Sequence, residues 1–214
     1  MRTYGVVLAG GVGARLGLSV PKQQIKVAGK TILEHTVAAF NDAPEIDEVI
    51  VMVTPGWTDR VATLLNNHYG KISLILEGGS TRNETTRRVV DALGDIECKI
   101  LLHDAVRPLL DQRIISECVE ALDNFGAVDV VIPSADTIVT VDDEDVITHI
   151  PNRSRLRRGQ TPQAFRLSVL RSAYERAVED PYFNASDDCG VVLKYRPDVK
   201  IKCVLGAEHN IKVT

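Results

Sequence analysis

Short apolar stretches alternate with amphipathic stretches along most of this chain. The apolar stretches are rich in Val, Ile and Leu, which is typical of strands buried on both faces of a sheet. They lie at residues 4–9, 48–54, 72–76, 99–103 and 127–132. The stretches between them place apolar residues at helical spacing and predict helices at 31–41, 58–68, 83–93 and 112–124. Repeated strand–helix units of this kind predict an α/β fold, in which helices cover both faces of a mostly parallel sheet.

Residues 134–160 interrupt this alternation. Two β-like runs flank an acidic stretch at 142–145, which predicts a protruding β-hairpin arm with an acidic tip. A lone hairpin buries too little apolar surface to be stable, so we expect the arm to pack against a partner subunit. After the arm, the pattern predicts two helices and a strand, at 167–179, 187–195 and 200–205. We therefore expect residues 1–214 to form a single domain from which the arm projects.

Composition narrows the functional classes. The net charge of −4 in 214 residues argues against nucleic acid or an anionic membrane as the main partner. No stretch approaches the roughly 20 apolar residues of a membrane span, and the first apolar run is too short for a signal peptide. We therefore expect a cytoplasmic protein. The four cysteines are scattered and form no C-x-x-C pair, which leaves zinc and redox chemistry without support.

In a parallel sheet, ligands bind beyond the carboxyl ends of the strands, near the point where the strand order reverses. The loops that follow Ala9, Leu76, His103 and Ile132 should therefore carry the chemistry. The second of these contains Gly-Gly-Ser-Thr-Arg-Asn-Glu-Thr at 78–85. Its small residues and hydroxyls could read a ribose and a base edge, or could simply cap the following helix.

A glycine-rich loop follows the first strand, as Leu-Ala-Gly-Gly-Val-Gly-Ala-Arg-Leu-Gly at residues 8–17. Glycines at this place let backbone N–H groups approach a phosphate closely. The loop is not a P-loop, and Leu16 replaces the third glycine that a dinucleotide fingerprint requires. Arg15 and the nearby Lys22 suit a triphosphate, because reaction at phosphorus builds negative charge on the non-bridging oxygens. The alternative is a surface loop with two solvated cations.

Further charged groups come later in the chain. In His-Asp-Ala-Val-Arg-Pro, Asp104 could hold Mg²⁺ or a ribose hydroxyl and Arg107 a phosphate, unless they form only a structural ion pair. Arginines at 153, 155, 157 and 158 precede Gly-Gln-Thr-Pro-Gln and indicate either an anion site or a solvated face. Lys212 alone is an ordinary strand-end lysine. Motifs for a Ser-His-Asp triad or a His-Glu-x-x-His metal site are absent from the sequence.

Together, these motifs in this order resemble the cytidylyltransferases that act on methylerythritol 4-phosphate and on ribitol 5-phosphate, over essentially the whole chain. The resemblance implies a Rossmann-like nucleotidyltransferase domain and a homodimer in which the β-arms embrace. It also implies CTP as co-substrate, a sugar-alcohol phosphate as acceptor, and Mg²⁺ or another divalent cation. Members usually continue into a further helix after the motif that ends at Thr214. The sequence is therefore expected to be a shortened form or the front of a longer protein.

Within this family, the motifs favour the ribitol 5-phosphate branch. Asp-Ala-Val-Arg-Pro, Asp-Thr-Ile-Val and Gly-Gln-Thr-Pro-Gln, which begin at 104, 136 and 159, resemble that branch. Ser-Asp-Asp-Cys-Gly at 186–190 stands where the methylerythritol branch tends to have Thr-Asp-(Asp/Glu)-Ala-Ser. The expected products are CDP-ribitol and pyrophosphate, in the supply of a polyol-phosphate cell-surface polymer. The alternative is the methylerythritol enzyme of isoprenoid precursor synthesis, and a remote alternative is a non-catalytic nucleotide-binding protein.

The resemblance also implies a role for each matching position. Around CTP it places Leu8, Ala9, Gly10, Gly11, Gly13, Gly79, Ser80, Thr81, Arg82, Asn83, Glu84, Thr85 and Asp104. Asp104 is also the expected metal ligand. To the sugar-alcohol phosphate it assigns Arg107, Thr137, Arg153, Thr161 and Lys212, with Thr137 and Arg153 supplied by the partner's arm. The expected catalytic residues are Arg15, Lys22, Arg153 and Lys212.

We expect the chemistry to be direct in-line attack, in which an oxygen of the acceptor's phosphate attacks the α-phosphorus of CTP and pyrophosphate leaves. A phosphate monoester is already a competent nucleophile at neutral pH, so no strong general base is needed. Catalysis would then come from alignment of the reactants and neutralisation of their charge.

Overall fold

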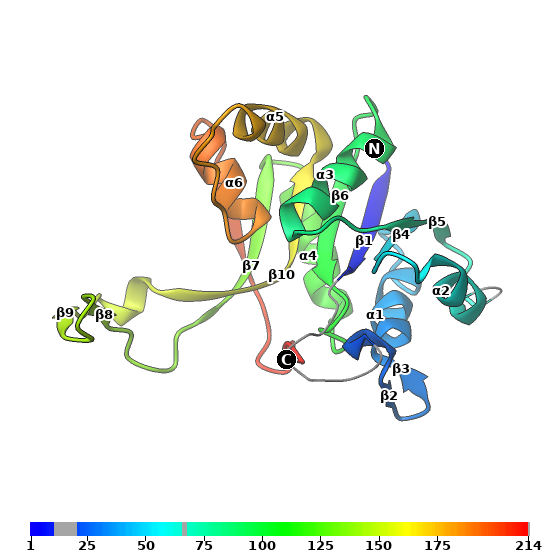
Figure 1. Cartoon of the computed structure of the whole chain (residues 1–214), viewed down its shortest axis with the longest axis horizontal. Coiled ribbons are helices and arrows are strands. Elements are labelled where there is room, and N and C mark those ends of the chain that lie inside the picture. Colours follow the sequence, from blue (N-terminus) through cyan, green and yellow to red (C-terminus); the bar gives the residue numbers. More distant parts are fainter. Residues whose placement is uncertain (11–20, 66–67, 214) are drawn as a thin grey trace.

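The computed structural model describes residues 1–10, 21–65 and 68–213. The predicted site residues Gly11, Gly13 and Arg15 lie outside this part of the chain. In the described part of the chain, the central sheet consists of seven strands, β1 (Thr3–Ala9), β4 (Glu48–Val53), β5 (Ile72–Glu77), β6 (Lys99–Asp104), β7 (Ala127–Pro133), β10 (Arg157–Arg166) and β11 (Ile201–Leu205). Within the described residues, they lie in the order β11-β7-β10-β6-β1-β4-β5 (Figure 1).

Neighbouring strands of this sheet run parallel except at β10, which lies antiparallel between β6 and β7. β1 pairs with β4 on one side and with β6 on the other, so the strand order reverses at β1. In an open α/β sheet, such a reversal forms a crevice beyond the carboxyl ends of the strands. The predicted mostly parallel sheet is confirmed, and the crevice lies at the end of β1.

Helices cover both faces of the sheet. One face is covered by α1 (Ile32–Asn41), α2 (Thr58–Leu65) and α4 (Gln112–Ala121). The other face is covered by α3 (Arg82–Leu93), α5 (Leu167–Val178) and α6 (Asp188–Tyr195). Side chains of β1 alternate between the two cores, with Val7 and Ala9 in the first and Tyr4 and Val6 in the second. Burial on both faces explains why these strands are continuous apolar stretches in the sequence.

Side-chain hydrogen bonds fix where two of the helices begin. At α1, Thr31 and Glu34 form a capping box, in which each side chain accepts a hydrogen bond from the other residue's backbone N–H. At α3, the hydroxyl of Thr81 accepts from the backbone N–H of Glu84 at 3.1 Å. Because α3 starts at the edge of the crevice, this cap holds Arg82 beside it.

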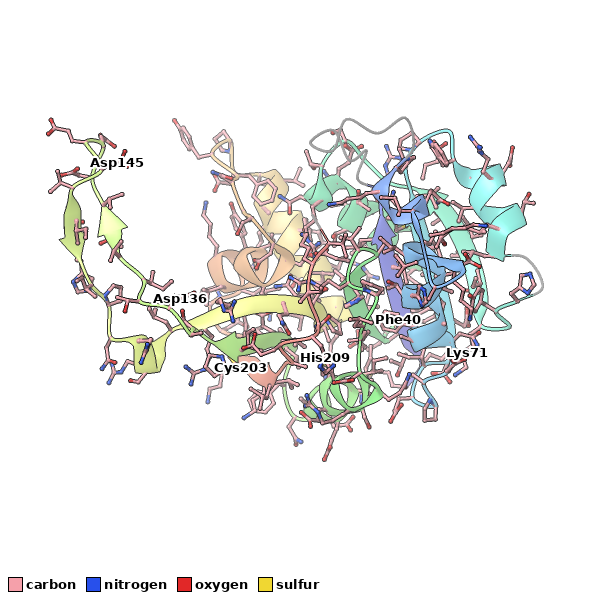
Figure 2. All side chains as sticks on the ribbon, turned by 90° about the horizontal axis from the view of Figure 1, so that it is seen from below. Phe40, Lys71, Asp136, Asp145, Cys203 and His209 are labelled. Carbon is pink, nitrogen blue, oxygen red and sulfur yellow. The ribbon has the colours of Figure 1, made fainter. Side chains whose placement is uncertain are left out.

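Between β7 and β10 the chain leaves the body as an arm, which we define as residues 134–156. A small hairpin of β8 (Thr140–Val141) and β9 (Ile147–His149) lies at its end, followed by the short helix η3 (Arg153–Arg155). Asp145 lies near the tip, far from Phe40 in the body (Figure 2). Apolar side chains of the arm are 40–57% exposed at Ile138, Val139, Val141, Val146, Ile147 and Ile150. The described residues of the arm thus form no core of their own.

β10 departs from the expectation drawn from the sequence, which gave residues 157–160 to the arm. The chain instead re-enters the sheet at Arg157 and forms a central antiparallel strand. Its arginines, Gly159 and Pro162 are atypical of such a position, because proline cannot donate a ladder hydrogen bond. The pairing with β7 shifts register between Gly159 and Gln163, and this irregularity accommodates Pro162.

The remaining elements are short. The 3₁₀ helix η2 (Lys22–Gln24) and a hairpin of β2 (Lys26–Val27) and β3 (Lys30–Thr31) precede α1. The other predicted helices and strands of the body occur with ends displaced by at most three residues. None of the helices in the described ranges is long and apolar enough to cross a membrane.

Candidate active site

A pocket of about 420 Å³ lies at the end of β1, where the strand order reverses. This volume lies within the usual range of small-molecule sites. Its walls come from the ends of β1 and β6, the loop between β5 and α3, η2 and the C-terminal segment. The predicted site residues that line it are Leu8, Ala9, Gly10, Lys22, Gly79, Ser80, Thr81, Arg82, Thr85, Asp104 and Lys212. Gln23, Ala105 and Val106 also line it, although the sequence gave them no role.

Asp104 is the electrostatic centre of this pocket. Its Oδ1 accepts a hydrogen bond from Nη1 of Arg82 at 2.6 Å. Its Oδ2 lies 2.8 Å from Nζ of Lys212 and 3.8 Å from Nε of Arg107. Burial alone would raise the pKa of Asp104, but the charges of Arg82 and Lys212 outweigh it and hold the pKa well below its usual range. The carboxylate therefore stays ionised and draws together cations from three separate segments.

Arg82 is held between two carboxylates. Its Nη1 faces Asp104, while its Nε donates to Oδ2 of Asp188 at 3.1 Å. Asp188, on α6, is fully buried, and its Oδ1 accepts from the hydroxyl of Tyr174 at 2.7 Å. Burial would lower the pKa of Arg82, but Asp188 and Asp104 outweigh it and raise the pKa above its usual range. Arg82 is therefore a permanent cation in the pocket wall.

His103 fixes the orientation of Thr161 behind Asp104. Nε2 of His103 lies 3.0 Å from the carbonyl oxygen of Arg107, which can only accept, so Nε2 carries the ring proton. Nδ1 then accepts from the Thr161 hydroxyl at 2.9 Å, and that hydroxyl accepts from the backbone N–H of Asp104 at 3.1 Å. The hydroxyl proton of Thr161 thus points to His103. Burial lowers the pKa of His103 to about 4, so the ring is neutral at pH 7.

Gln23 ties η2 to the ends of β1 and β4. The side chain is buried, and its Nε2 donates to the carbonyl oxygen of Ala9 at 2.5 Å and to Oγ1 of Thr54 at 3.4 Å. Thr54 donates to the same carbonyl at 3.3 Å. These contacts explain how Lys22, the neighbour of Gln23, comes to line the pocket. The sequence indicated that Pro-Lys-Gln at 21–23 lies close to the glycine-rich loop. It gave no reason to assign a role to the glutamine.

Several predicted residues of the body lie beside the pocket without lining it. Nδ2 of Asn83 donates to the carbonyl oxygen of Ala185 at 3.2 Å. The carboxylate of Glu84 accepts from the backbone N–H and the hydroxyl of Ser80, both at 2.7 Å, and so holds the loop before α3. Nη1 of Arg107 donates to the carbonyl oxygen of Asn210 at 2.7 Å. These contacts stabilise the walls of the pocket.

Thr137 and Arg153 lie on the arm and are exposed. Neither lines the pocket of its own chain. Nη1 of Arg153 donates to the carbonyl oxygen of Ala135, at 3.0 Å, within the arm.

The pocket has a surplus of positive charge. Lys22, Arg82 and Lys212 line it, and Asp104 is the one acidic side chain among its described lining residues. Such a surplus suits a polyphosphate. The described ranges contain no group of three or more His, Cys, Asp or Glu side chains that could hold a metal ion. Because Mg²⁺ commonly binds one or two carboxylates together with substrate phosphates, Asp104 fits a Mg²⁺ that arrives with a nucleotide.

Comparison with known proteins agrees with this geometry. Residues 4–214 match the sequence model of the family described as IspD, 2-C-methyl-D-erythritol 4-phosphate cytidylyltransferase. A Thermobifida fusca protein with that enzyme name is 47% identical over 220 residues, which cover 100% of this chain and 88% of the relative. The bifunctional ribulose 5-phosphate reductase/CDP-ribitol pyrophosphorylase Bcs1 of Haemophilus influenzae is 44% identical over 217 residues. That match covers 100% of this chain, which spans 46% of the bifunctional protein.

Solved structures share the fold. The crystal structure of 4-diphosphocytidyl-2C-methyl-D-erythritol synthase from Anaerococcus prevotii matches with a TM-score of 0.88 and 30% identity, over 100% of this chain and 90% of that one. The 2-C-methyl-D-erythritol 4-phosphate cytidylyltransferase of Thermus thermophilus matches with a TM-score of 0.77 and 30% identity, over 100% and 93%. Both matches extend over the whole chain, including the arm.

Proposed function

The chain belongs to the IspD family of cytidylyltransferases, and from this premise we propose that its Asp104 pocket joins the cytidylyl group of CTP to a polyol phosphate. Nucleotidyl transfer from CTP is the activity of the family. The observation that carries the assignment is that Lys22, Arg82 and Lys212 line one pocket at the switch point of the sheet. Two of these cations, Arg82 and Lys212, contact Asp104. A triphosphate and a phosphate monoester meet in this reaction, and both need cations around them.

For the acceptor, we propose 2-C-methyl-D-erythritol 4-phosphate. This was the alternative in the sequence analysis, and the relatives support it better than ribitol 5-phosphate. The matching family model and the 47% identical relative both carry the methylerythritol name. The product would be 4-diphosphocytidyl-2-C-methyl-D-erythritol, with release of pyrophosphate.

Ribitol 5-phosphate remains the second candidate, because two observations favour it. The Haemophilus protein that includes a CDP-ribitol pyrophosphorylase is 44% identical, close to the value for the methylerythritol relative. The motifs at 104–108, 136–139 and 159–163 also resemble the ribitol branch, and the motif at 186–190 departs from the pattern of the methylerythritol branch. A few pocket residues decide between such acceptors, so overall identity alone separates them weakly.

The proposed mechanism is in-line attack by a phosphate oxygen of the acceptor on the α-phosphorus of CTP. One P–O bond forms to the acceptor's phosphate, and the bond to the β-phosphate breaks as pyrophosphate leaves. Lys22 would stabilise charge on the reacting phosphoryl group, together with Arg15 of the glycine-rich loop. Lys212 would hold the acceptor's phosphate in line. This reaction requires no proton to be removed from the acceptor by the protein.

We propose that Asp104 takes part in holding Mg²⁺. The ion would neutralise charge on the phosphates of CTP, and its other ligands would be phosphate oxygens and water. Both oxygens of Asp104 already face cations of the protein, at 2.6 and 2.8 Å. An ionised carboxylate has about four acceptor sites on its two oxygens, so Asp104 keeps capacity for Mg²⁺ beside both cations.

We further propose a homodimer in which each arm completes the pocket of the other subunit. Two features support it. The arm carries exposed apolar side chains that lack a core. Thr137 and Arg153 lie on the arm, and neither lines the pocket of its own chain. Packing against a second copy would bury the apolar side chains and bring an extra cation to the acceptor's phosphate.

The experiment that tests the proposed function is pyrophosphate release from CTP and Mg²⁺ with each acceptor in parallel. Faster release with methylerythritol 4-phosphate, compared as kcat/KM, is the expected result. Faster release with ribitol 5-phosphate would transfer the assignment to the second candidate and leave the pocket chemistry intact. Absence of release with both acceptors, in a protein that still binds CTP, would contradict the proposal and favour a non-catalytic nucleotide-binding protein.

A further inference from the structure

Asp188 lies outside the pocket but contacts its wall. Its side chain is fully buried at the start of α6, and its backbone N–H donates to Oε1 of Gln163 at 3.1 Å. One carboxylate oxygen accepts from Nε of Arg82 and the other from the hydroxyl of Tyr174. In the sequence, Asp188 is part of the Ser-Asp-Asp-Cys-Gly motif at 186–190, to which the proposed mechanism gives no role.

The geometry of Arg82 depends on this contact. A guanidinium presents its donors in a fixed fork, and it commonly grips one carboxylate with two parallel hydrogen bonds. Here the fork is divided, because Nε and Nη2 both lie 3.1 Å from Oδ2 of Asp188 while Nη1 alone faces Asp104. Asp104 consequently gives one oxygen to Arg82 and keeps the other for Lys212.

Without the charge of Asp188, the guanidinium would have a single anionic partner. The favoured arrangement would then be the two-pronged grip on Asp104. That grip would use Oδ2, the oxygen that now lies 2.8 Å from Lys212. Lys212 would lose its anchor, and the orientation of the Asp104 carboxylate in the pocket would change.

We propose that Asp188 is a positioning residue for cytidylyl transfer, which acts by holding Arg82 so that Asp104 keeps one oxygen for Lys212 and the ligand. This inference rests on the proposed function of the pocket. Asp188 contacts neither reactant in it, and its effect passes through Arg82 alone. The hydroxyl of Tyr174 supports Asp188 from the far side and lies 3.1 Å from Oδ1 of Asn83. Among the hydrogen bonds and ion pairs of the described residues, none joins Tyr174 to Arg82.

The experiment compares Asp188→Asn with Tyr174→Phe in the full chain. Asp188→Asn keeps the shape but removes the charge, so kcat should fall about 10- to 100-fold from misalignment, while KM for CTP changes less than about threefold. Tyr174→Phe removes a hydrogen bond to the same carboxylate and leaves the ion pair, so kcat should stay within about threefold of wild type. Equal losses in the two variants, or a wild-type kcat in Asp188→Asn, would overturn the proposal.

A second comparison asks whether Asp188 acts through Arg82. In an Arg82→Gln background, Asp188→Asn should lower kcat by less than about twofold, because the group that it positions is already gone. The same fold-loss in both backgrounds would contradict the proposal. If Arg82→Gln alone does not fold, since it leaves Asp188 as a lone buried charge, the Asp188→Asn and Tyr174→Phe pair decides by itself. Wild-type turnover is measured first, so an inactive wild type counts against the proposed function and not against Asp188.

Discussion

Nζ of Lys212 lies 2.8 Å from Oδ2 of Asp104, which brings the last described residues of the chain to the end of β6. Two further contacts hold this segment in place. Nδ2 of the buried Asn210 donates to the carbonyl oxygen of Thr161 at 2.8 Å, and the backbone N–H of Val213 donates to the carbonyl oxygen of Val106 at 2.9 Å. Lys212 therefore lines the pocket because its neighbours on both sides are fixed.

Lys212→Gln should separate activity from stability. The lysine side chain is 46% exposed, and an ion pair of that exposure contributes little to folding. Its ammonium nevertheless lines the pocket, so we expect kcat to fall about 100-fold in the pyrophosphate-release assay. The thermal midpoint should stay within about 2 °C of wild type. Lys200→Gln, at an exposed position outside the pocket, is the matched control and should retain full activity.

Unlike Lys212→Gln, Asp104→Asn should lower both stability and activity by a large amount. Asp104 is buried, and loss of its negative charge leaves Arg82, Arg107 and Lys212 close together without the anion that they share. Loss of one partner of a buried ion pair costs roughly 3 kcal/mol, which corresponds to about 10 °C in a chain of this size. Thermal unfolding followed by circular dichroism measures it. An unchanged midpoint would show that the three cations do not depend on Asp104.

Lys22→Ala should lower turnover by orders of magnitude in a folded protein. Lys22 lines the pocket at the start of η2, next to Gln23, whose hydrogen bonds to β1 and β4 do not involve the lysine side chain. Loss of a cation that stabilises the reacting phosphoryl group costs about 100- to 1000-fold in kcat. Lys26→Ala, in the neighbouring hairpin and outside the pocket, is the control. Near-normal turnover in Lys22→Ala would remove this residue from the mechanism.

His103 should make the folded state sensitive to acid. Burial lowers the pKa of His103 to about 4, whereas an unfolded histidine titrates at 6.5. Between those values the unfolded chain binds a proton that the folded chain does not, so stability falls as the pH drops from 6.5 towards 4. His103 alone should account for about 2–3 kcal/mol lost between pH 7 and pH 4.5.

The measurement for His103 is urea unfolding at pH 7 and at pH 4.5, for wild type and His103→Gln. The variant should be less stable at pH 7, because Thr161 loses its acceptor, but its stability should depend less on pH. The difference between the two pH dependences isolates the histidine from other acid-sensitive groups. Parallel pH dependences in the two proteins would show that His103 accepts a proton in the folded state.

Elements buried on both faces could be predicted from the sequence, and elements whose position depends on distant partners could not. β1 is a continuous apolar stretch because both of its faces are buried, with Val6 in one core and Val7 in the other. β10 carries arginines, Gly159 and Pro162, and only its pairing with β6 and β7 makes it a strand. Tertiary pairing overrides local propensity at such a place.

The pocket shows the same division. Asp104 was predictable as a pocket residue because it lies at the carboxyl end of a buried strand, where a parallel sheet binds ligands. The contacts from Asp104 through Arg82 to Asp188 could not be predicted. They join side chains of β6, α3 and α6, which lie far apart in the chain and therefore form no recognisable sequence motif. Glu84 was predicted to bind the nucleotide but does not line the pocket. Its carboxylate instead accepts a hydrogen bond from the backbone N–H of Ser80.

The arm allows a decisive test of the proposed dimer by mixing two inactive variants. Arg153→Gln alters the arm, and Lys212→Gln alters the pocket of the body. If each arm serves the other subunit, a mixed dimer contains one pocket with Lys212 from one chain and Arg153 from its partner, and one pocket that lacks both. Co-refolding equal amounts should therefore restore about a quarter of wild-type activity, since half of the dimers are mixed and each has one intact pocket.

Two controls accompany the mixing experiment. Sedimentation should give wild type a mass of twice the 23.5 kDa chain, and Ile147→Asp, which places a charge on the exposed apolar side of the arm, should shift it towards a single chain. Arg158→Gln is the matched arginine control, because its partner Glu208 belongs to its own body. If Arg153 instead served its own chain, the mixed dimers would hold one defect in every pocket and no activity would return.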